Sequence, residues 1–178
     1  GELGVGARYT DLDAMIARHQ PDIVAIPTGT EFHYPLALRV LEYGVHIDIE
    51  KPLCVDCEQA DEVLAKAGEK NTRIAVHHQG RTGVWMKAVA KAFAEGRIGE
   101  LRHIHGHGKN YYGGYNLMNI GTHMINNMLK IAGPCRSVVA SATTAGRPIA
   151  PTDVVPSPQG MGTIAGEQIT ASLDLDGG

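Results

Sequence analysis

Residues 44–52 read Gly-Val-His-Ile-Asp-Ile-Glu-Lys-Pro. The apolar run from Val45 to Ile49 is typical of a buried parallel strand, and Glu-Lys-Pro follows it directly. Open α/β sheets bind their ligands at the edge formed by the carboxyl ends of such strands. Lysine changes its pKa readily when desolvated, so Lys51 at this edge is a candidate proton donor or acceptor. The alternative is a solvated Glu-Lys pair in a surface loop.

Strands and helices alternate on both sides of this stretch. Apolar residues at helical spacing predict helices over 11–19, 32–43 and 57–69. A continuous apolar run, of the kind covered on both faces of a sheet, predicts a strand over 23–26, and a further strand is predicted over 73–77. Because the connections are short, the crossovers are expected to be right-handed and the sheet parallel. The sequence therefore predicts a doubly wound α/β sheet over residues 1–80.

The pattern changes near residue 80, which we take as a domain boundary between 1–80 and 81–178. Beyond it, the sequence predicts helices over 81–95 and 118–131 and strands over 101–109, 137–143 and 167–175. The last of these alternates as an antiparallel strand does. Residues 146–166 are rich in proline and glycine and predict a long surface loop.

Composition limits the classes of function. The net charge is −3 and no basic run stands out, which argues against a nucleic-acid or membrane-surface partner. No apolar stretch is long enough to span a bilayer. The cysteines are an odd set that we expect to be reduced, which favours a cytoplasmic setting. Cys54-x-x-Cys57 could form a redox or zinc pair, but small buried or helix-entry residues are the preferred interpretation.

Polar segments follow all three predicted strands of the first half. They are Pro27-Thr-Gly-Thr30, Glu50-Lys-Pro52 and His77-His-Gln79, and in a parallel sheet they would share one edge. Thr28 and Thr30 offer hydroxyl groups there, and the following helix offers its positive N-terminus. His33 in that helix is either a binding residue or a packing residue.

A second candidate group lies on the helix predicted over 118–131. Asn119, His123 and Asn126 or Asn127 are near the spacing that places them on one face. Gly121 costs such a helix about 1 kcal/mol relative to alanine, which makes sense where a ligand or backbone approaches closely. The alternative is that His123 is a hydrogen-bonded core residue.

Three histidines alternate along the strand predicted over 101–109. His103, His105 and His107 would face the same side and could bind zinc. No carboxylate or cysteine lies within this strand to complete a ligand set, so no metal site is predicted. A metal-dependent enzyme using these histidines remains an alternative.

The chain resembles the Gfo/Idh/MocA family of NAD(P)-dependent oxidoreductases. The matching stretches are Pro21-Asp-Ile-Val-Ala-Ile-Pro-Thr28, His33, Gly44-Val-His-Ile-Asp-Ile-Glu-Lys-Pro-Leu53, Gly96-Arg-Ile-Gly99 and Asn119-Ile-Gly-Thr-His123. The resemblance implies a Rossmann-like domain followed by an α/β domain with an open, mainly antiparallel sheet. It also implies an enzyme that transfers a hydride between NAD or NADP and a hydroxyl carbon of a sugar, polyol or related compound.

The resemblance also assigns roles to residues. Lys51 would bond the substrate oxygen beside the nicotinamide, and His123 would accept or relay the proton. Pro27, Thr28, Thr30, His33 and Gln79 would line the cofactor, with Glu50 and Pro52 fixing Lys51. The open sheet of such second domains commonly packs against another subunit, so a homo-oligomer is an expectation.

Two departures from the family pattern stand out. Asn119 occupies the position where the family often has aspartate, and an amide can orient a substrate but cannot accept a proton. This departure favours the alternative of a non-catalytic sugar- or nucleotide-binding module. Gly1, Gly4 and Gly6 do not form the G-x-G-x-x-G turn that would bind the pyrophosphate. We therefore expect a piece of a longer protein that by itself binds dinucleotide poorly.

Overall fold

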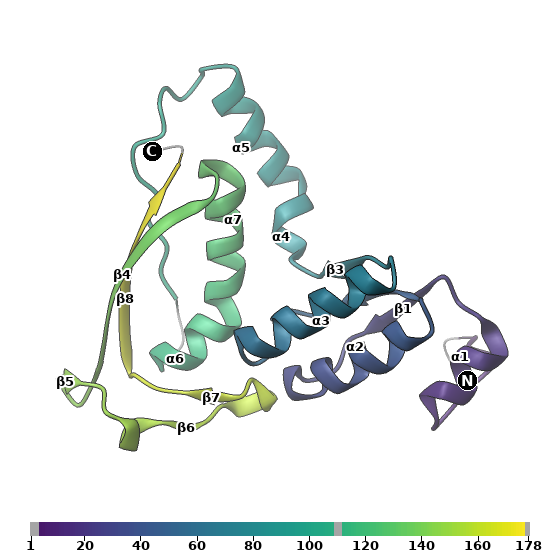
Figure 1. Cartoon of the computed structure of the whole chain (residues 1–178). Helices are drawn as coiled ribbons and strands as arrows, with labels where there is room; N and C mark the ends of the chain where they lie inside the picture. The colour runs from purple at the N-terminus through teal and green to yellow at the C-terminus, as the bar shows by residue number, and fades with distance from the viewer. Residues whose placement is uncertain (1–3, 109–111, 177–178) are drawn as a thin grey trace.

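The computed structural model describes residues 4–108 and 112–176. Its first half is a parallel sheet with helical crossovers (Figure 1). The elements are α1 (Leu12–His19), β1 (Ile23–Ile26), η1 (Thr30–Phe32), α2 (His33–Glu42), β2 (His46–Ile49), α3 (Cys57–Glu69) and β3 (Ile74–Val76). The strands pair in the order β1-β2-β3, all parallel. The parallel α/β sheet and its helices are thus confirmed.

Local sequence signals set the ends of these helices. The Asp11 side chain accepts hydrogen bonds from the backbone N–H groups of Asp13 and Ala14, which caps α1. Asp56 caps α3 in the same way through the N–H of Gln59. After α2 the chain turns at Gly44, whose φ of +67° is a conformation that glycine adopts without strain.

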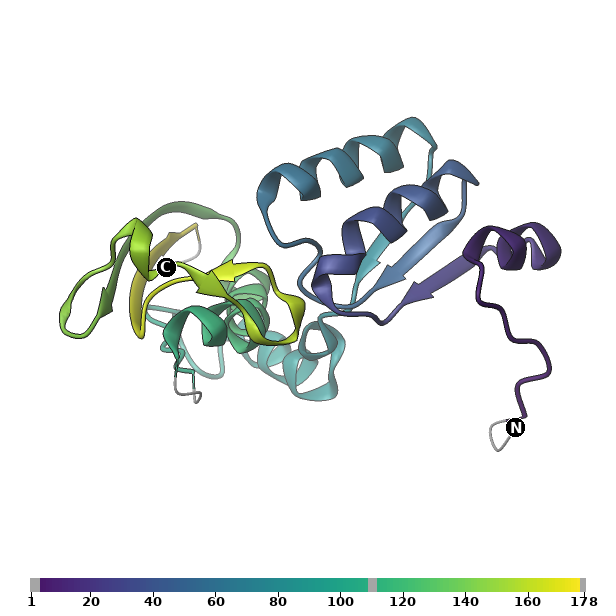
Figure 2. The ribbon, with the colours of Figure 1, turned by 90° about the horizontal axis from the view of Figure 1, so that it is seen from below.

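The core of this half lies between the sheet and two helices. Figure 2 shows α2 and α3 side by side on one face of the sheet. Val40 and Leu41 of α2 and Val63 of α3 are fully buried, and Ile47 and Ile49 of β2 are nearly so. The prediction that β1 is covered on both faces is wrong, because Ile23 and Ala25 are exposed while their neighbours are buried. The crossover helices α2 and α3 cover only the face on which Val24 and Ile26 lie. β1 is also an edge strand of the sheet.

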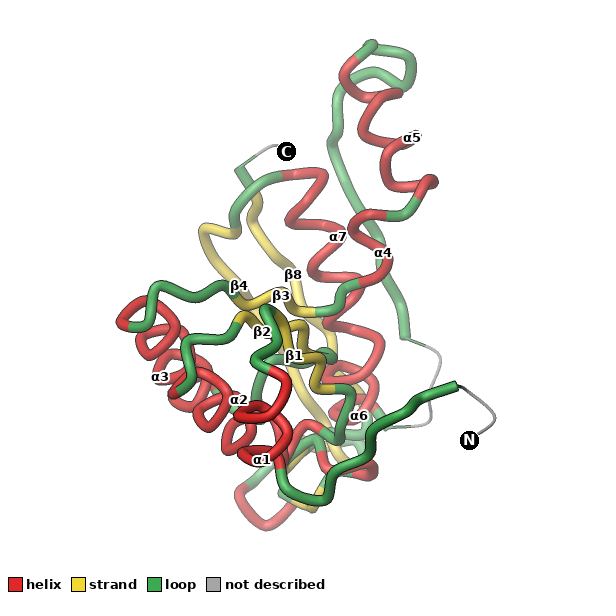
Figure 3. Tube along the Cα trace, turned by 90° about the vertical axis from the view of Figure 1, so that its right-hand side faces the viewer, coloured by secondary structure: helices red, strands yellow, loops and turns green. Residues whose placement is uncertain are grey.

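The second half combines helices with an antiparallel sheet. Its helices are α4 (Gln79–Thr82), α5 (Val84–Ala94), α6 (Gly113–Asn116), the π-helical segment η2 (Leu117–Gly121) and α7 (Thr122–Ala132). β4 (Cys135–Thr144) pairs antiparallel with β8 (Gln168–Leu175) and with β5 (Arg147–Pro148). This confirms the open antiparallel sheet. Figure 3 shows α7 crossing beside these strands, with α4 and α5 further along the same side.

Two predicted helices have different bounds from those expected. The helix over 81–95 is divided into α4 and α5 at Gly83, which is extended and lies under the Trp85 ring. The helix over 118–131 starts five residues early because Gly113 and Gly114 donate backbone hydrogen bonds to the carbonyls of Glu167 and Gly166. Those two glycines fit against the backbone of the β7–β8 connection, where a Cβ would collide.

The strand predicted over 101–109 is wrong for the residues that the structure describes. Residues 101–108 have no regular secondary structure, and Lys109 lies outside the described residues. Alternation alone cannot form a strand, since a strand needs a neighbour to satisfy its backbone groups. Gly106 instead packs closely against Met124 and Met128 of α7.

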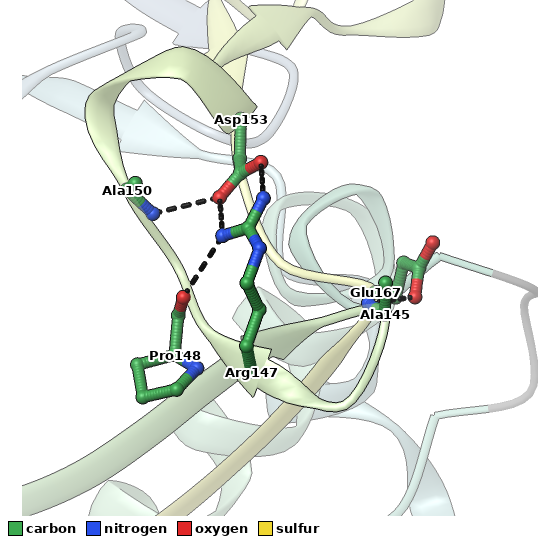
Figure 4. Close-up of polar contacts among 6 residues, drawn as sticks. All are labelled: Ala145, Arg147, Pro148, Ala150, Asp153 and Glu167. Atoms are coloured by element: carbon green, nitrogen blue, oxygen red, sulfur yellow. Dashed lines mark hydrogen bonds and ion pairs between the residues drawn. The ribbon is translucent and has the colours of Figure 1, made fainter.

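The segment 146–166, predicted as a loop, has short ordered elements. They are η3 (Pro151–Asp153), η4 (Pro158–Gly160) and a two-stranded ladder of β6 (Val155–Pro156) with β7 (Thr163–Ile164). Figure 4 shows Arg147 bound to both carboxylate oxygens of Asp153, at 2.7 and 2.8 Å. The same carboxylate accepts the Ala150 N–H at 2.7 Å, and its pKa is lowered to about 2, chiefly by Arg147. The turn is therefore fixed by one ion pair.

No helix in the described part of the chain combines the length and the apolar character needed to cross a membrane.

Candidate functional site

The segments after β1, β2 and β3 lie side by side at the carboxyl edge of the parallel sheet. The ladder continues just past the strands, with Glu50 N–H donating to Ile26 O at 3.1 Å and His77 N–H donating to Ile49 O at 2.8 Å. In this way the three polar segments predicted from sequence meet at one edge. This is the edge at which parallel α/β sheets bind ligands.

His33 joins the first two of these segments from inside the protein. Its side chain is fully buried, with Nδ1 2.9 Å from the Pro52 carbonyl oxygen and Nε2 3.1 Å from that of Thr28. Thr30 is only 3% exposed, and the Lys51–Pro52 peptide bond is cis. His33 therefore holds the loops from behind the edge, where Thr30 is also buried, while Pro27 and Thr28 are exposed on it.

Lys51 reaches from this edge to the second half of the chain. Its Nζ donates to the side-chain Oδ1 of Asn119 at 2.6 Å and to the Asn119 backbone oxygen at 3.1 Å. The Asn119 amide donates in turn to the hydroxyl of Tyr115 at 3.0 Å. Asn119 belongs to the π-helical segment η2, and such segments occur frequently at functional sites. Burial lowers the pKa of Lys51, while the nearby charge of Glu50 opposes that shift.

His123, one turn beyond Asn119, packs against His78 from the loop after β3. The ring centroids are 5.5 Å apart and the rings are nearly perpendicular, at 88°. Burial lowers the pKa of His123, and the charge of Lys51 lowers it further. Burial also lowers the pKa of His78, with added effects from His123 and Lys51, and its Nδ1 is buried with no hydrogen-bond partner among the residues that the structure describes. Both imidazoles are therefore biased toward the neutral form.

Arg81 of α4 contacts the same helical run, η2 and α7, that Lys51 and His78 contact. Its Nη1 donates to the backbone oxygen of Asn126 at 3.1 Å and to the Asn126 side-chain oxygen at 3.2 Å. Next to it, Gly80 lies so close to Asn127 that a Cβ would be 3.1 Å from the amide nitrogen. The α4 turn therefore packs against α7.

The structure brings some of the predicted site residues together and separates others. Lys51, Asn119 and His123 meet, and exposed Gln79 lies at the start of α4 near them. The imidazoles of His103 and His105 are adjacent, with centroids 4.2 Å apart. Among the described residues, however, no three histidine, cysteine or acidic side chains are placed to hold a metal ion. Cys54 is buried, which raises the pKa of its thiol to about 11, and Cys57 is exposed.

Sequence reasoning missed Tyr115 and Arg81, and it placed His78 at the sheet edge without its contact to His123. Tyr115 lies four residues before Asn119, a spacing that would have identified it if the helix had been predicted from Gly113. His78 and Arg81 follow the third strand, but their roles depend on contacts with a helix more than forty residues away. No local pattern signals such contacts.

The arrangement has the parts needed for proton transfer at a ligand oxygen. A partly desolvated lysine can hold or protonate an oxygen atom, and a neutral imidazole can accept a proton from it. Both groups stand at the ligand-binding edge of a parallel sheet.

Comparisons with known proteins agree with this fold. Residues 2–78 match the family model GFO_IDH_MocA, described as "Oxidoreductase family, NAD-binding Rossmann fold". A 1,5-anhydro-D-fructose reductase from Ensifer adhaerens is 32% identical over 98 residues, which are 55% of this chain and 29% of the relative. D-glucoside 3-dehydrogenase from Escherichia coli is 28% identical over 146 residues, covering 74% of this chain and 42% of the relative.

Solved structures share the fold along nearly the whole chain. The WlbA dehydrogenase from Bordetella pertussis, in complex with NADH and UDP-GlcNAcA, has a TM-score of 0.70 at 23% identity, over 99% of this chain and 55% of that one. An NAD binding oxidoreductase from Klebsiella pneumoniae has a TM-score of 0.72 at 22% identity, over 98% of this chain and 50% of that one. The chain thus spans about half the length of these structures. Over residues 2–78, the chain is similar to the Gfo/Idh/MocA family of NAD-binding oxidoreductases.

Proposed function

We propose that this chain carries the proton-handling site of an NAD(P)-dependent dehydrogenase that acts on a hydroxyl carbon of a sugar, polyol or related compound. The observation that supports this most is the position of Lys51. Its Nζ stands at the carboxyl edge of the parallel sheet, held by Asn119, and its charge acts on His123. The relatives named as sugar reductases and dehydrogenases support the same class of substrate.

The residues at the sheet edge suit a nicotinamide cofactor, either NAD or NADP. This edge presents hydroxyl, amide and backbone groups. They come from exposed Pro27, Thr28 and Gln79 and from half-buried Glu50 and Lys51. His33 and Pro52 hold the two loops from within. When bound, the nicotinamide ring supplies the hydride acceptor for oxidation and the hydride donor for reduction. A neighbour of the same fold has NADH bound.

Lys51 and His123 divide the proton chemistry in this proposal. Oxidation of an alcohol removes a hydride from carbon and a proton from the hydroxyl oxygen. The lowered pKa of His123 keeps its imidazole neutral near pH 7, so it can take the hydroxyl proton. Lys51 donates a hydrogen bond to the same oxygen and stabilises the negative charge that develops on it. In reduction both transfers run backward.

In this mechanism Asn119 holds the Lys51 ammonium in position and does not itself accept a proton from the substrate or donate one to it. Its side-chain oxygen accepts from Lys51, and its amide nitrogen donates to Tyr115, so both ends of the amide are engaged. An amide in place of a carboxylate leaves the lysine charge uncompensated. The second candidate function, a binding module without hydride chemistry, is favoured by this same residue.

Turnover distinguishes the two functions. The purified protein is supplied with a panel of sugars and polyols and with NAD+ or NADP+ at a concentration that saturates binding, because the chain is expected to bind dinucleotide poorly. Reduced nicotinamide is followed by its absorbance. The dehydrogenase proposal predicts turnover that Lys51→Met and His123→Gln both abolish without loss of folding. Substrate binding without turnover, for every member of the panel with either cofactor, would favour the binding module.

Two expectations about the setting of the protein belong to the same proposal. The three cysteines are free thiols, as expected of a protein in the reducing cytoplasm. The open face of the β4–β8 sheet, where Val139 is 75% exposed, is expected to pack against a second copy. Sedimentation velocity of the protein and of Val139→Lys tests that association.

A further inference from the structure

Two cations at the site are bound only by neutral groups. Lys51 is held by the amide and backbone oxygens of Asn119, and Arg81 by those of Asn126. Among the described residues, neither forms an ion pair with a carboxylate, although other lysines and arginines of the chain do. The hydrogen bonds fix both cations in place but leave their positive charge uncompensated.

These contacts form a row along one helical face. Asn119, His123 and Asn126 are spaced i, i+4, i+7, so they share a face of the continuous run from η2 into α7. Each of them contacts one basic residue from the sheet edge or from α4: Lys51, His78 and Arg81, respectively. At 1.5 Å per residue, the row is about 10 Å long.

Acidic residues are scarce around this row. The helical run from Gly113 to Gly133 contains no aspartate or glutamate. The charges acting on His123 are those of Lys51 and His77, which are basic, and of Glu50. Arg81 adds a further positive charge next to His78. One carboxylate thus stands among several basic groups, and the site attracts anions.

We propose that the substrate of this site carries a carboxylate or phosphate group, bound by Arg81, about 10 Å or less from the carbon that reacts beside Lys51. The inference rests on the proposed function, to which it adds the charge of the substrate. Arg81 is exposed, and only its Nη1 is used by Asn126, which leaves Nη2 and Nε for a bidentate contact with an anion. A neutral sugar would leave this cation unpaired.

The chain has a built-in reporter for binding at Arg81. Trp85 is its single tryptophan, and the ring lies over the turn that carries Arg81. A Cβ at Gly80 would be 3.3 Å from the ring, and one at Gly83 would be 3.1 Å from its Nε1. The Trp85 side chain is half exposed, so its fluorescence responds to a ligand on this turn.

The test compares ligands that share a sugar ring and differ in whether they carry an anionic group. D-glucuronate and D-glucose share a ring but differ by one carboxylate, and D-glucose 6-phosphate offers a phosphate in its place. Each is titrated at low ionic strength with Trp85 fluorescence as the readout. We expect at least one of the two anions to bind about tenfold more tightly than glucose, with the difference reduced by added salt. Which anion binds more tightly identifies the group.

Substitutions assign the effect to Arg81. Arg81→Gln is expected to abolish the preference, and Arg81→Lys, which keeps the charge but not the bidentate fork, to retain part of it. Arg18→Gln in α1 makes the same change in net charge far from the site and is expected to keep the full preference (Figure 1). Equal binding of anions and glucose, no response to any of the three ligands, or a preference that survives in Arg81→Gln would overturn the inference. Since the titration contains no cofactor, its failure is distinguishable from absence of dehydrogenase activity.

Discussion

Lys51 and Asn119 lie 68 positions apart in the chain, yet the lysine Nζ donates to the asparagine Oδ1 across 2.6 Å. The lysine comes from the end of a parallel strand, and the asparagine comes from the π-helical segment before α7. This contact places the lysine of the sheet edge beside the histidine of the helix. It also pairs an ammonium with a neutral acceptor, which keeps the positive charge available to a ligand.

Replacing the neutral acceptor is expected to change the protonation of the lysine. Burial holds the pKa of Lys51 below its ordinary value of 10.5. In Asn119→Asp, a carboxylate beside the ammonium favours the charged form, so the Lys51 pKa rises. NMR titration of isotopically labelled lysine measures this. Asn127→Asp is the charge-matched control, and an unchanged or lower Lys51 pKa in Asn119→Asp would contradict the contact.

Acid is expected to destabilise the site through its two adjoining imidazoles. The pKa values of His78 and His123 are both lowered from 6.5 in the folded protein, so the unfolded chain binds more protons just below that pH. The free energy of unfolding should therefore rise as the pH rises toward 6.5 and level off above it. Urea unfolding across this range measures the slope. His78→Gln should flatten it, exposed His105→Gln should not, and an equal slope in His78→Gln would refute the assignment.

Loss of the buried imidazole at position 33 is expected to loosen both edge loops. His33→Leu removes the ring nitrogens that lie 2.9 Å from the Pro52 carbonyl oxygen and 3.1 Å from that of Thr28, and with them the N–H that one of these oxygens accepts. An unsatisfied buried polar group costs about 1 to 3 kcal/mol, so the free energy of unfolding should fall by roughly that amount or more. Denaturant unfolding measures it, with exposed His19→Leu as the control. A loss below about 0.5 kcal/mol would show that His33 does not hold the loops.

Tyr115 is expected to position Asn119. Tyr115→Phe removes the acceptor of the asparagine amide nitrogen but keeps the ring. The amide can then rotate away from Lys51, and the loss of a hydrogen bond worth about 1 kcal/mol should reduce kcat several-fold with a smaller change in KM. Steady-state kinetics measures both constants. An unchanged kcat, or a change confined to KM, would place Tyr115 outside the positioning chain.

The spacing of apolar residues was enough to predict most of the parallel half. Helix ends in this half are set by single residues, namely the capping side chains of Asp11 and Asp56 and the positive φ of Gly44. Signals of this kind can be identified from the sequence because they do not depend on distant residues. The meeting of the three polar segments followed from the parallel order of the strands. These parts of the site could be inferred without any long-range contact.

The predictions that failed concern structure that depends on contacts with residues distant in sequence. The alternation of His103, His105 and His107 resembles a strand, but within the described residues no strand pairs with it. The early start of the helix before Asn119 depends on carbonyls of residues 166 and 167, which no local signal announces. The contacts of His78 and Arg81 arise in the same way, from packing of α4 on α7.

The central claim is that Lys51 takes part in hydride transfer chemistry at this site. Its most direct test is the initial rate of reduced nicotinamide formation by the purified enzyme and by Lys51→Met, with exposed Lys87→Met as the matched control. The account predicts a rate reduced by about 10²- to 10⁴-fold in Lys51→Met, with folding retained and the control unchanged. A Lys51→Met rate within about twofold of the unsubstituted enzyme would contradict it.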